Sequence, residues 1–258
     1  MLHISVFITV YILVIAFVLG AVFGSFLNCM AWRIAHNESV LHGRSHCPTC
    51  NHLLGAGDLV PIFSYIFLGG KCRYCGTKIS PRYFLTELLM AMAFVAVVVR
   101  YDVTFDALRY LVLICILLTL SLVDLEIYEI PDRFHIAGIV WWAVTIPLTA
   151  EPWKLQLEKG LIGAFVIAGA MLLLAVIFDK VTGKESLGGG DVKLFFMTGL
   201  YLGPWIGLFN LIVACIIGII FVVVMKQRKI PFGPAISIAV FISILVGNNV
   251  ISWYLSLL

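Results

Sequence analysis

The chain has 258 residues, of which 62% are hydrophobic and only 12% are charged, whereas soluble domains are about 45–50% apolar and about 25% charged. This composition excludes an ordinary soluble enzyme, a disordered chain and a disulfide-rich secreted domain. The formal net charge of +3 is small and says nothing about nucleic acid, because the distribution of charge between the two sides of a membrane matters more than its sum. We expect a lipid bilayer and no nucleic acid around this protein.

Apolar runs long enough to cross a bilayer follow one another along the chain. A span needs about 20 predominantly apolar residues, and the runs lie at 6–28, 83–99, 107–124, 134–150, 160–179, 205–225 and 233–256. The first run lacks the small-residue cleavage site of a signal peptide, so it is interpreted as a retained span. The short stretch 194–203 is an eighth candidate, although runs of this length can also be re-entrant.

The positions of Lys and Arg favour eight spans over seven. With eight spans and both termini outside, four segments face inward and hold 13 of the 17 Lys and Arg, namely 29–82, 125–133, 180–193 and 226–232. Cytoplasmic loops carry such an excess of positive charge. The sequence therefore predicts an all-α polytopic membrane protein with about eight transmembrane helices. We divide it into a first span (1–28), a cytoplasmic segment (29–82) and a core of about seven spans (83–258).

Two Cys-x2-Cys pairs stand in the polar segment 29–82. They are Cys47-Pro-Thr-Cys50 and Cys72-Arg-Tyr-Cys75, and 21 residues separate them. Two such pairs are typical of a four-thiolate zinc site. Free thiols and disulfides are the alternatives, although a cytoplasmic loop stays reduced; a nearby histidine could also replace one ligand. Four thiolates leave no open position for water, so we expect a structural zinc that staples the loop.

Two acidic residues stand at the predicted cytoplasmic ends of spans. Asp124 ends the run 107–124, and Asp191 follows the glycines 188–190. Two carboxyl groups at one depth of a small bundle can approach each other and share a proton. One can then take a proton from water while the other protonates an amide carbonyl. The alternative is that each aspartate merely caps a helix.

Other acidic residues crowd the loop that follows Asp124. Glu126, Glu129 and Asp132 all lie within it. Each of them could be solvated, and any of them could replace Asp124 as the partner of Asp191. Together the four acids make a local negative patch, which would attract a basic ligand.

Two further charged residues have open roles. Glu87 lies about one turn inside the second predicted span, where it either pairs with Arg82 or faces the site. Lys193 follows Asp191 by two positions and could orient or neutralise it. Ionisable groups within spans are costly and are functional by default.

Six motifs occur in an order that resembles the type IV prepilin peptidases, a group of GxGD-type membrane aspartyl proteases, over nearly the whole chain. They are Gly24-Ser25-Phe26-Leu27-Asn28 with Arg33, the two cysteine pairs, Ile79-Ser80-Pro81-Arg82-Tyr83 with Glu87, Asp124-Leu125-Glu126 through Ile130-Pro131-Asp132, Gly188-Gly189-Gly190-Asp191-Val192-Lys193, and Pro231-Phe232-Gly233-Pro234. Members often carry Asp two positions after the first catalytic aspartate. Glu126 stands there in this chain and keeps the charge.

The resemblance implies a set of site residues. The catalytic pair would be Asp124 and Asp191, and the zinc ligands would be Cys47, Cys50, Cys72 and Cys75. The expected substrate-binding or supporting residues are Gly188, Gly189, Gly190, Lys193, Glu87, Glu126, Pro231, Gly233 and Pro234.

The resemblance also implies an enzyme of the bacterial inner membrane whose active site faces the cytoplasm. It would cleave the basic leader from prepilins or pseudopilins after a Gly, and many members then N-methylate the new terminus with S-adenosylmethionine. The chain has no G-x-G-x-x-G turn between a strand and a helix to bind that methyl donor. A transporter that moves protons or cations, and a zinc-module scaffold without peptidase activity, are the alternatives. The sequence does not give the oligomeric state.

Overall fold

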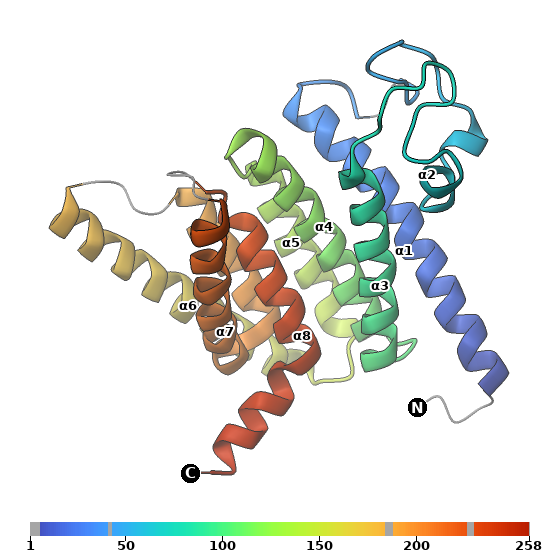
Figure 1. The fold of residues 1–258 in the computed structure, drawn as a ribbon. Coiled ribbons are helices and arrows are strands. Elements are labelled where there is room, and N and C mark those ends of the chain that lie inside the picture. The colour runs from blue at the N-terminus through green and yellow to red at the C-terminus, as the bar shows by residue number, and fades with distance from the viewer. Residues whose placement is uncertain (1–5, 41–42, 184–187, 226–229, 258) are drawn as a thin grey trace. The chain divides into compact units, whose positions relative to one another are not determined.

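The computed structural model describes residues 6–40, 43–183, 188–225 and 230–257. Within these ranges the chain is helical, and its β-structure is limited to two isolated bridges. The elements are α1 (Val6–Ala35), η1 (Ala56–Asp58), α2 (Phe63–Phe67), α3 (Pro81–Tyr101), α4 (Phe105–Ile127), α5 (Asp132–Thr145), η2 (Ile146–Leu148), α6 (Trp153–Thr182), α7 (Gly189–Met225) and α8 (Gly233–Leu255), as Figure 1 shows.

Six of these helices are long and apolar enough to cross a membrane, namely α1, α3, α4, α6, α7 and α8. The protein is therefore a multi-pass membrane protein. The expected span at 134–150 folds as α5 and η2, and α5 has only 14 residues. Four basic residues of the predicted cytoplasmic segments lie outside the described residues: Lys184, Lys226, Arg228 and Lys229.

A break inside α7 separates the two runs that the sequence suggests at 194–203 and 205–225. Gly203 has non-helical dihedral angles, with φ 68° and ψ −176°, and Pro204 follows it. A positive φ is readily adopted only by glycine, and Pro204 lacks the N–H that would continue the helix. When α5 and both parts of α7 are counted, the described residues form eight apolar helical segments at the places where the sequence predicts them.

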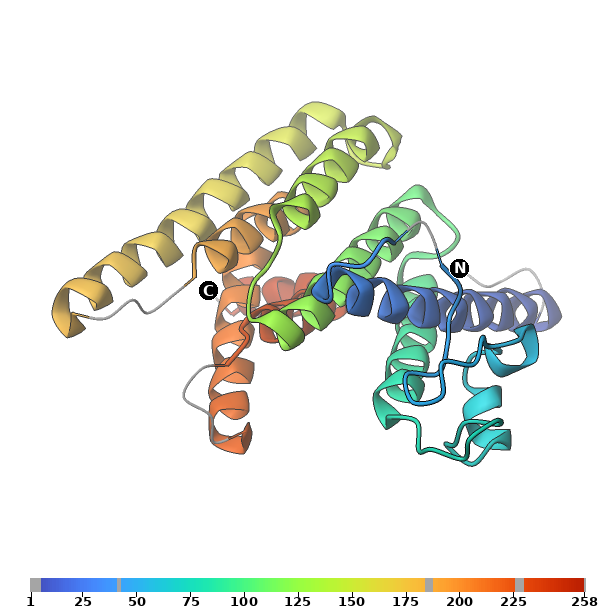
Figure 2. The same ribbon diagram turned by 90° about the horizontal axis from the view of Figure 1, so that it is seen from above.

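The chain divides into two compact units, Met1–Val103 and Thr104–Leu258. In the first unit α1 lies against α3 (Figures 1 and 2). A methyl group added to Gly20 would lie 2.5 Å from the carbonyl oxygen of Met90, so glycine is required for this close approach. Asn28 donates a hydrogen bond to Thr86 Oγ1 at 2.8 Å in the buried contact. The Gly24–Asn28 motif therefore has a packing role at the end of α1.

In the second unit α6 packs against α7 through small residues. A methyl group on Gly163 would lie 2.5 Å from the carbonyl carbon of Gly203 and 2.6 Å from the carbonyl oxygen of Gly199. Small residues that let backbones approach are typical of helix contacts in membranes, where hydrophobic burial gives little preference for one packing. The backbone contact fixes α6 against the break in α7.

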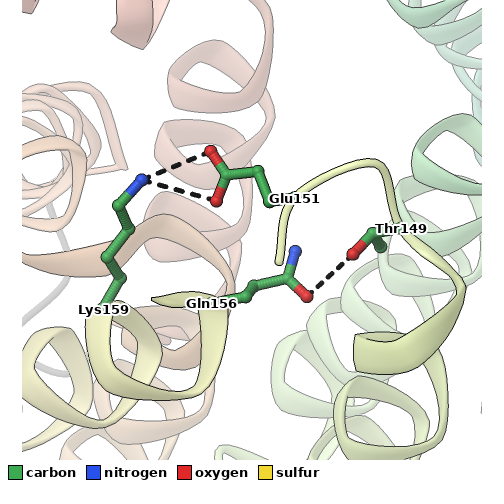
Figure 3. A network of polar contacts seen from close by, with 4 residues as sticks. All are labelled: Thr149, Glu151, Gln156 and Lys159. Atoms are coloured by element: carbon green, nitrogen blue, oxygen red, sulfur yellow. Dashed lines mark hydrogen bonds and ion pairs between the residues drawn. The ribbon is translucent and has the colours of Figure 1, made fainter. Parts of the chain in front are cut away.

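The connection from α5 to α6 is held by polar contacts (Figure 3). Thr149 and Gln156 form a hydrogen bond of 2.9 Å, and Lys159 Nζ lies 3.3 Å from Glu151 Oε1. The ion pair is exposed on both sides, so it contributes at most about 1 kcal/mol. These contacts order the turn that leads into α6.

The glycine contact at α6 predicts a specific effect on stability. Gly163→Ala should lower the free energy of unfolding by about 1–3 kcal/mol, because its methyl group meets backbone atoms that cannot move aside easily. Gly169→Ala is the matched control on the same helix, since a methyl group there meets nothing within 4 Å. Thermal unfolding in detergent micelles measures both. Equal melting temperatures for the two variants would contradict the packing role.

Candidate functional site

The four cysteines of the two pairs lie together in the first unit. Their sulfur atoms are all within 4.8 Å of one another, and the Sγ atoms of Cys47 and Cys75 are 3.8 Å apart. A tetrahedral zinc with Zn–S bonds of about 2.3 Å holds its sulfurs about 3.8 Å apart. The geometry therefore fits a four-thiolate zinc site, and these cysteines could hold the ion.

Both cysteine pairs fold into the same turn. The N–H of Cys47 donates to the carbonyl of His52, and the N–H of Cys72 donates to the carbonyl of Thr77. The residue after each second cysteine is left-handed, Asn51 with φ 56° and Gly76 with φ 72°. Asn and Gly are the residues that adopt this conformation at low cost. The repeated turn points both cysteines of each pair at one centre.

Hydrogen bonds within the turns favour thiolates at two positions. Backbone N–H groups of Cys50 and Thr49 lower the pKa of Cys47. The Thr77 hydroxyl and backbone lower the pKa of Cys75 to about 6. The pKa of Cys50 is instead raised to about 11, because the lowering effect of the His52 backbone is outweighed by burial and the neighbouring thiols. The thiolate is the form that binds metal.

Contacts around Asp58 attach the second turn to the rest of the loop. Arg73 Nε lies 2.7 Å from Asp58 Oδ1, and the Tyr74 hydroxyl donates to Asp58 Oδ2 at 3.0 Å. The Gly55 N–H also donates to this carboxylate, and it is the largest cause that lowers the pKa of Asp58. The ring of Tyr74 packs on His52 at 3.6 Å between centroids, so the two turns also contact each other directly.

Glu87 holds this loop to α3. Its Oε2 accepts a hydrogen bond of 2.6 Å from the backbone N–H of Ile62, and the carboxylate is buried. Ile62 has φ 66° and ψ −56°, and its neighbours form an i to i+2 hydrogen bond from Phe63 to Pro61. This is a strained γ-turn, rare for a β-branched residue. This contact with Ile62 is neither of the two roles left open for Glu87, because its partner is neither Arg82 nor an aspartate.

Asp124 is buried near the end of α4, with 4% of its surface exposed. Its Oδ2 accepts a hydrogen bond of 2.9 Å from the N–H of Gly233, at the start of α8. A methyl group on Gly233 would lie 2.7 Å from the same oxygen, so only glycine allows this approach. Pro234 then occupies the first turn of α8, where the missing N–H has no cost. The motif at Pro231–Pro234 thus positions a backbone donor at Asp124.

Asp191 lies in the first turn of α7 and is half-buried. A methyl group on the preceding Gly190 would lie 3.4 Å from Ile130 Cβ, and a methyl group on Gly233 would lie 3.3 Å from Ile130 Cδ1. Ile130 belongs to the first aspartate motif, and it therefore lies beside Gly190 of the second motif and beside Gly233, whose N–H bonds to Asp124.

Lys193 reaches α5 and not Asp191. Its Nζ lies 2.7 Å from Asp132 Oδ1, and this hydrogen bond lowers the pKa of Asp132. Both side chains are more than half exposed, so the ion pair is a weak link at the surface. It compensates one of the acidic charges in the loop after Asp124. Glu126 is half-buried, whereas Glu129 is exposed.

His135 is a site residue that the sequence reasoning missed. It is 4% exposed, and neither of its ring nitrogens has a hydrogen-bond partner among the residues that the structure describes. Its Nδ1 lies 3.7 Å from Asp132 Oδ1. The signal that could have revealed it is an ionisable residue inside the apolar run 134–150, since such residues are functional by default.

Comparisons with known proteins match both units separately. A model of the Bacterial Peptidase A24 N-terminal domain matches residues 18–101, and a model of the Type IV leader peptidase family matches residues 111–223. Each match lies inside one of the two compact units. No solved structure matches this chain.

Curated relatives match over nearly the whole chain. The prepilin leader peptidase/N-methyltransferase of Bacillus subtilis (strain 168) is 32% identical over 94% of this chain and 98% of its own length. The type 4 prepilin-like proteins leader peptide-processing enzyme of Escherichia coli O78:H11 is 35% identical over 87% of this chain and 90% of its length. A prepilin leader peptidase/N-methyltransferase of Neisseria gonorrhoeae is 29% identical over 94% of each chain.

The cysteine geometry predicts about one zinc per chain in the purified protein, because the cluster offers four ligands to one ion. Elemental analysis measures this ratio. Cys47→Ser should lower the zinc content and the thermal stability. Cys215→Ser, an exposed cysteine on α7, is the control and should change neither. A metal-free protein whose loop resists proteolysis as well as the wild type does would contradict the zinc site.

Proposed function

This chain belongs to the Type IV leader peptidase family, and we propose that it is a membrane aspartyl protease in which Asp124 and Asp191 cut a prepilin or pseudopilin after a Gly. The observation that carries this proposal is the contact of Gly190 and Gly233 with one side chain, Ile130. It supports a catalytic pair because each glycine stands beside one of the two aspartates, by sequence or by hydrogen bond.

The proposed chemistry needs one ionised and one protonated carboxyl group. The ionised carboxylate takes a proton from water as the water oxygen attacks the carbonyl carbon of the substrate glycine. The protonated carboxyl group donates its proton to the carbonyl oxygen. Collapse of the tetrahedral intermediate breaks the C–N bond and returns a proton to the leaving amine. The Gly233 N–H fixes the orientation of Asp124 during these steps.

The proposals of a bound zinc ion and of a methyl donor rest on different kinds of evidence. The four cysteines would hold zinc as a structural ion, because four thiolates complete its coordination. N-methylation of the new terminus with S-adenosylmethionine is proposed from the names of the relatives alone.

The proposed location is the bacterial inner membrane, with the aspartates facing the cytoplasm. The excess of Lys and Arg in the segments next to Asp124, Asp191 and the cysteines supports this orientation. Prepilin leaders, which are basic, would then meet the acidic loop after Asp124 on the same side.

Single substitutions of the aspartates test the catalytic pair. Asp124→Asn and Asp191→Asn should each abolish cleavage of a prepilin-like peptide, because an amide can neither accept nor donate the proton that the mechanism requires. Glu126→Gln is the matched control and should retain most of the activity. Cleavage is followed by mass spectrometry of the products. Near-normal turnover in either Asn variant would reject the pair, and the reverse ranking would assign the base to Glu126.

The acidic loop predicts a dependence on the charge of the leader. Neutralising Glu129 and Asp132 together should raise KM for a basic leader, with each exposed charge contributing roughly 0.2–1 kcal/mol. The effect should shrink in high salt, since the screening length is about 8 Å at physiological ionic strength. A substrate with a neutral leader is the control and should keep its KM. An equal change for both substrates would show that the loop does not recognise leader charge.

A further inference from the structure

A groove of about 290 Å³ lies between α5 and the first part of α7. Its lining residues are Asp132, His135, Ile136, Ile139, Lys193 and Phe196. The polar residues stand at one end, and the two isoleucines and Phe196 continue along both helices at spacings of three to four residues. Such spacings place side chains on one face of a helix. The groove is therefore polar near the start of α7 and apolar beyond it.

The position of the groove relates it to Asp191. Lys193 follows Asp191 by two residues in the first turn of α7, and Phe196 lies one turn further on. The groove therefore begins within one turn of Asp191 along α7, on a different side of that helix, since residues two apart in a helix do not face each other. The apolar part of the groove, lined by Ile136, Ile139 and Phe196, matches the apolar segment that follows the cut in the proposed substrate.

The buried ring of His135 has no hydrogen-bond partner within the described residues, so both nitrogens can bond to a ligand. Buried polar groups are nearly always hydrogen-bonded, because leaving one without a partner is unfavourable. Asp132 and Lys193 are the charged residues that line the groove with it, and they pair with each other at 2.7 Å. Neither forms a hydrogen bond to the ring within the described part of the chain.

A substrate at the cut site has backbone groups that lack hydrogen-bond partners. A peptide bond must be unwound from its helix to be attacked, and its neighbours then lose their backbone hydrogen bonds in an apolar setting. Each unsatisfied N–H or C=O group there costs several kcal/mol. A buried imidazole offers one donor and one acceptor, which can satisfy such groups.

We propose that this groove holds the first residues after the cut, with His135 hydrogen-bonded to their backbone and Ile136, Ile139 and Phe196 in contact with their apolar side chains. The inference rests on the proposed function. His135 acts here as a positioning residue that binds unwound substrate, and the aspartates perform the chemistry.

Three variants test the groove in full-length protein. His135→Leu removes both hydrogen-bonding nitrogens, His135→Gln keeps a donor and an acceptor, and Ile139→Trp fills the apolar part. Leu173→Trp on α6 is the control, because Leu173 is also apolar and partly accessible but lies outside the groove. KM and kcat are measured in micelles with two peptides that share one leader. One peptide carries the apolar segment, and the other ends about two residues after the cut.

For the long peptide, His135→Leu should raise KM about tenfold, as the loss of one hydrogen bond to a buried group predicts. Ile139→Trp should raise KM by a similar factor, because its ring fills the apolar part of the groove. The kcat should stay within about threefold, and His135→Gln should recover part of the affinity. Ile139→Trp should affect the short peptide much less. Melting temperatures are recorded for each variant, and Ile139→Trp and His135→Gln carry the test if His135→Leu unfolds.

Two outcomes separate this inference from the proposed function. If the wild type cleaves the long peptide but Ile139→Trp and His135→Leu keep its KM, or lower kcat alone, the groove does not bind substrate. If the wild type cleaves neither peptide nor a full prepilin, the proposed function itself fails.

Discussion

The hydrogen bond from the Gly233 N–H to Asp124 Oδ2 is the contact on which the candidate site depends. It joins the end of α4 to the start of α8 across 109 residues of sequence. The backbone must come so close that any Cβ at position 233 would collide with the carboxylate. A buried carboxylate needs such a donor, because an unpaired charge away from water is strongly unfavourable. Ile130 then packs between this contact and Gly190.

Close backbone contacts serve the same purpose in the rest of the protein. Gly20 lets α1 approach the backbone of α3, and Gly163 lets α6 approach the break in α7. In lipid, apolar surfaces have little preference for each other over the acyl chains, so packing has to come from shape. The glycines therefore determine where the helices pack against each other. The polar motifs determine which side chains lie together at those contacts.

The sequence predicts most reliably those features that depend on spacing. The two Cys-x2-Cys pairs predict a shared site because each pair is a local turn, and the structure places all four sulfurs together. The apolar runs predict the membrane helices, and Gly203-Pro204 falls between two of them. The catalytic assignment of Asp124 and Asp191 stays a prediction, although Ile130 of the first motif lies beside Gly190 of the second.

Contacts to the backbone and contacts between distant side chains could not be predicted from the sequence. Glu87 bonds to the N–H of Ile62, and no residue type signals that a main-chain group will be its partner. Lys193 pairs with Asp132, 61 residues away, although Asp191 is much nearer along the chain. The direction in which a side chain points from its helix decides such pairings. This direction cannot be predicted from the amino-acid composition.

The position of Ile62 connects the zinc loop to the packing of the first unit. Its side chain packs in a cluster with Ala21 of α1 and Ala91 of α3, while its N–H is held by Glu87. A strained γ-turn persists only where the surroundings over-determine it, and here a buried carboxylate and two helices do so. Since Asp58 links the second cysteine turn to the segment just before Ile62, loss of the metal would loosen a loop whose Ile62 packs against both α1 and α3. A structural zinc would thus stabilise these membrane helices without contacting either of them.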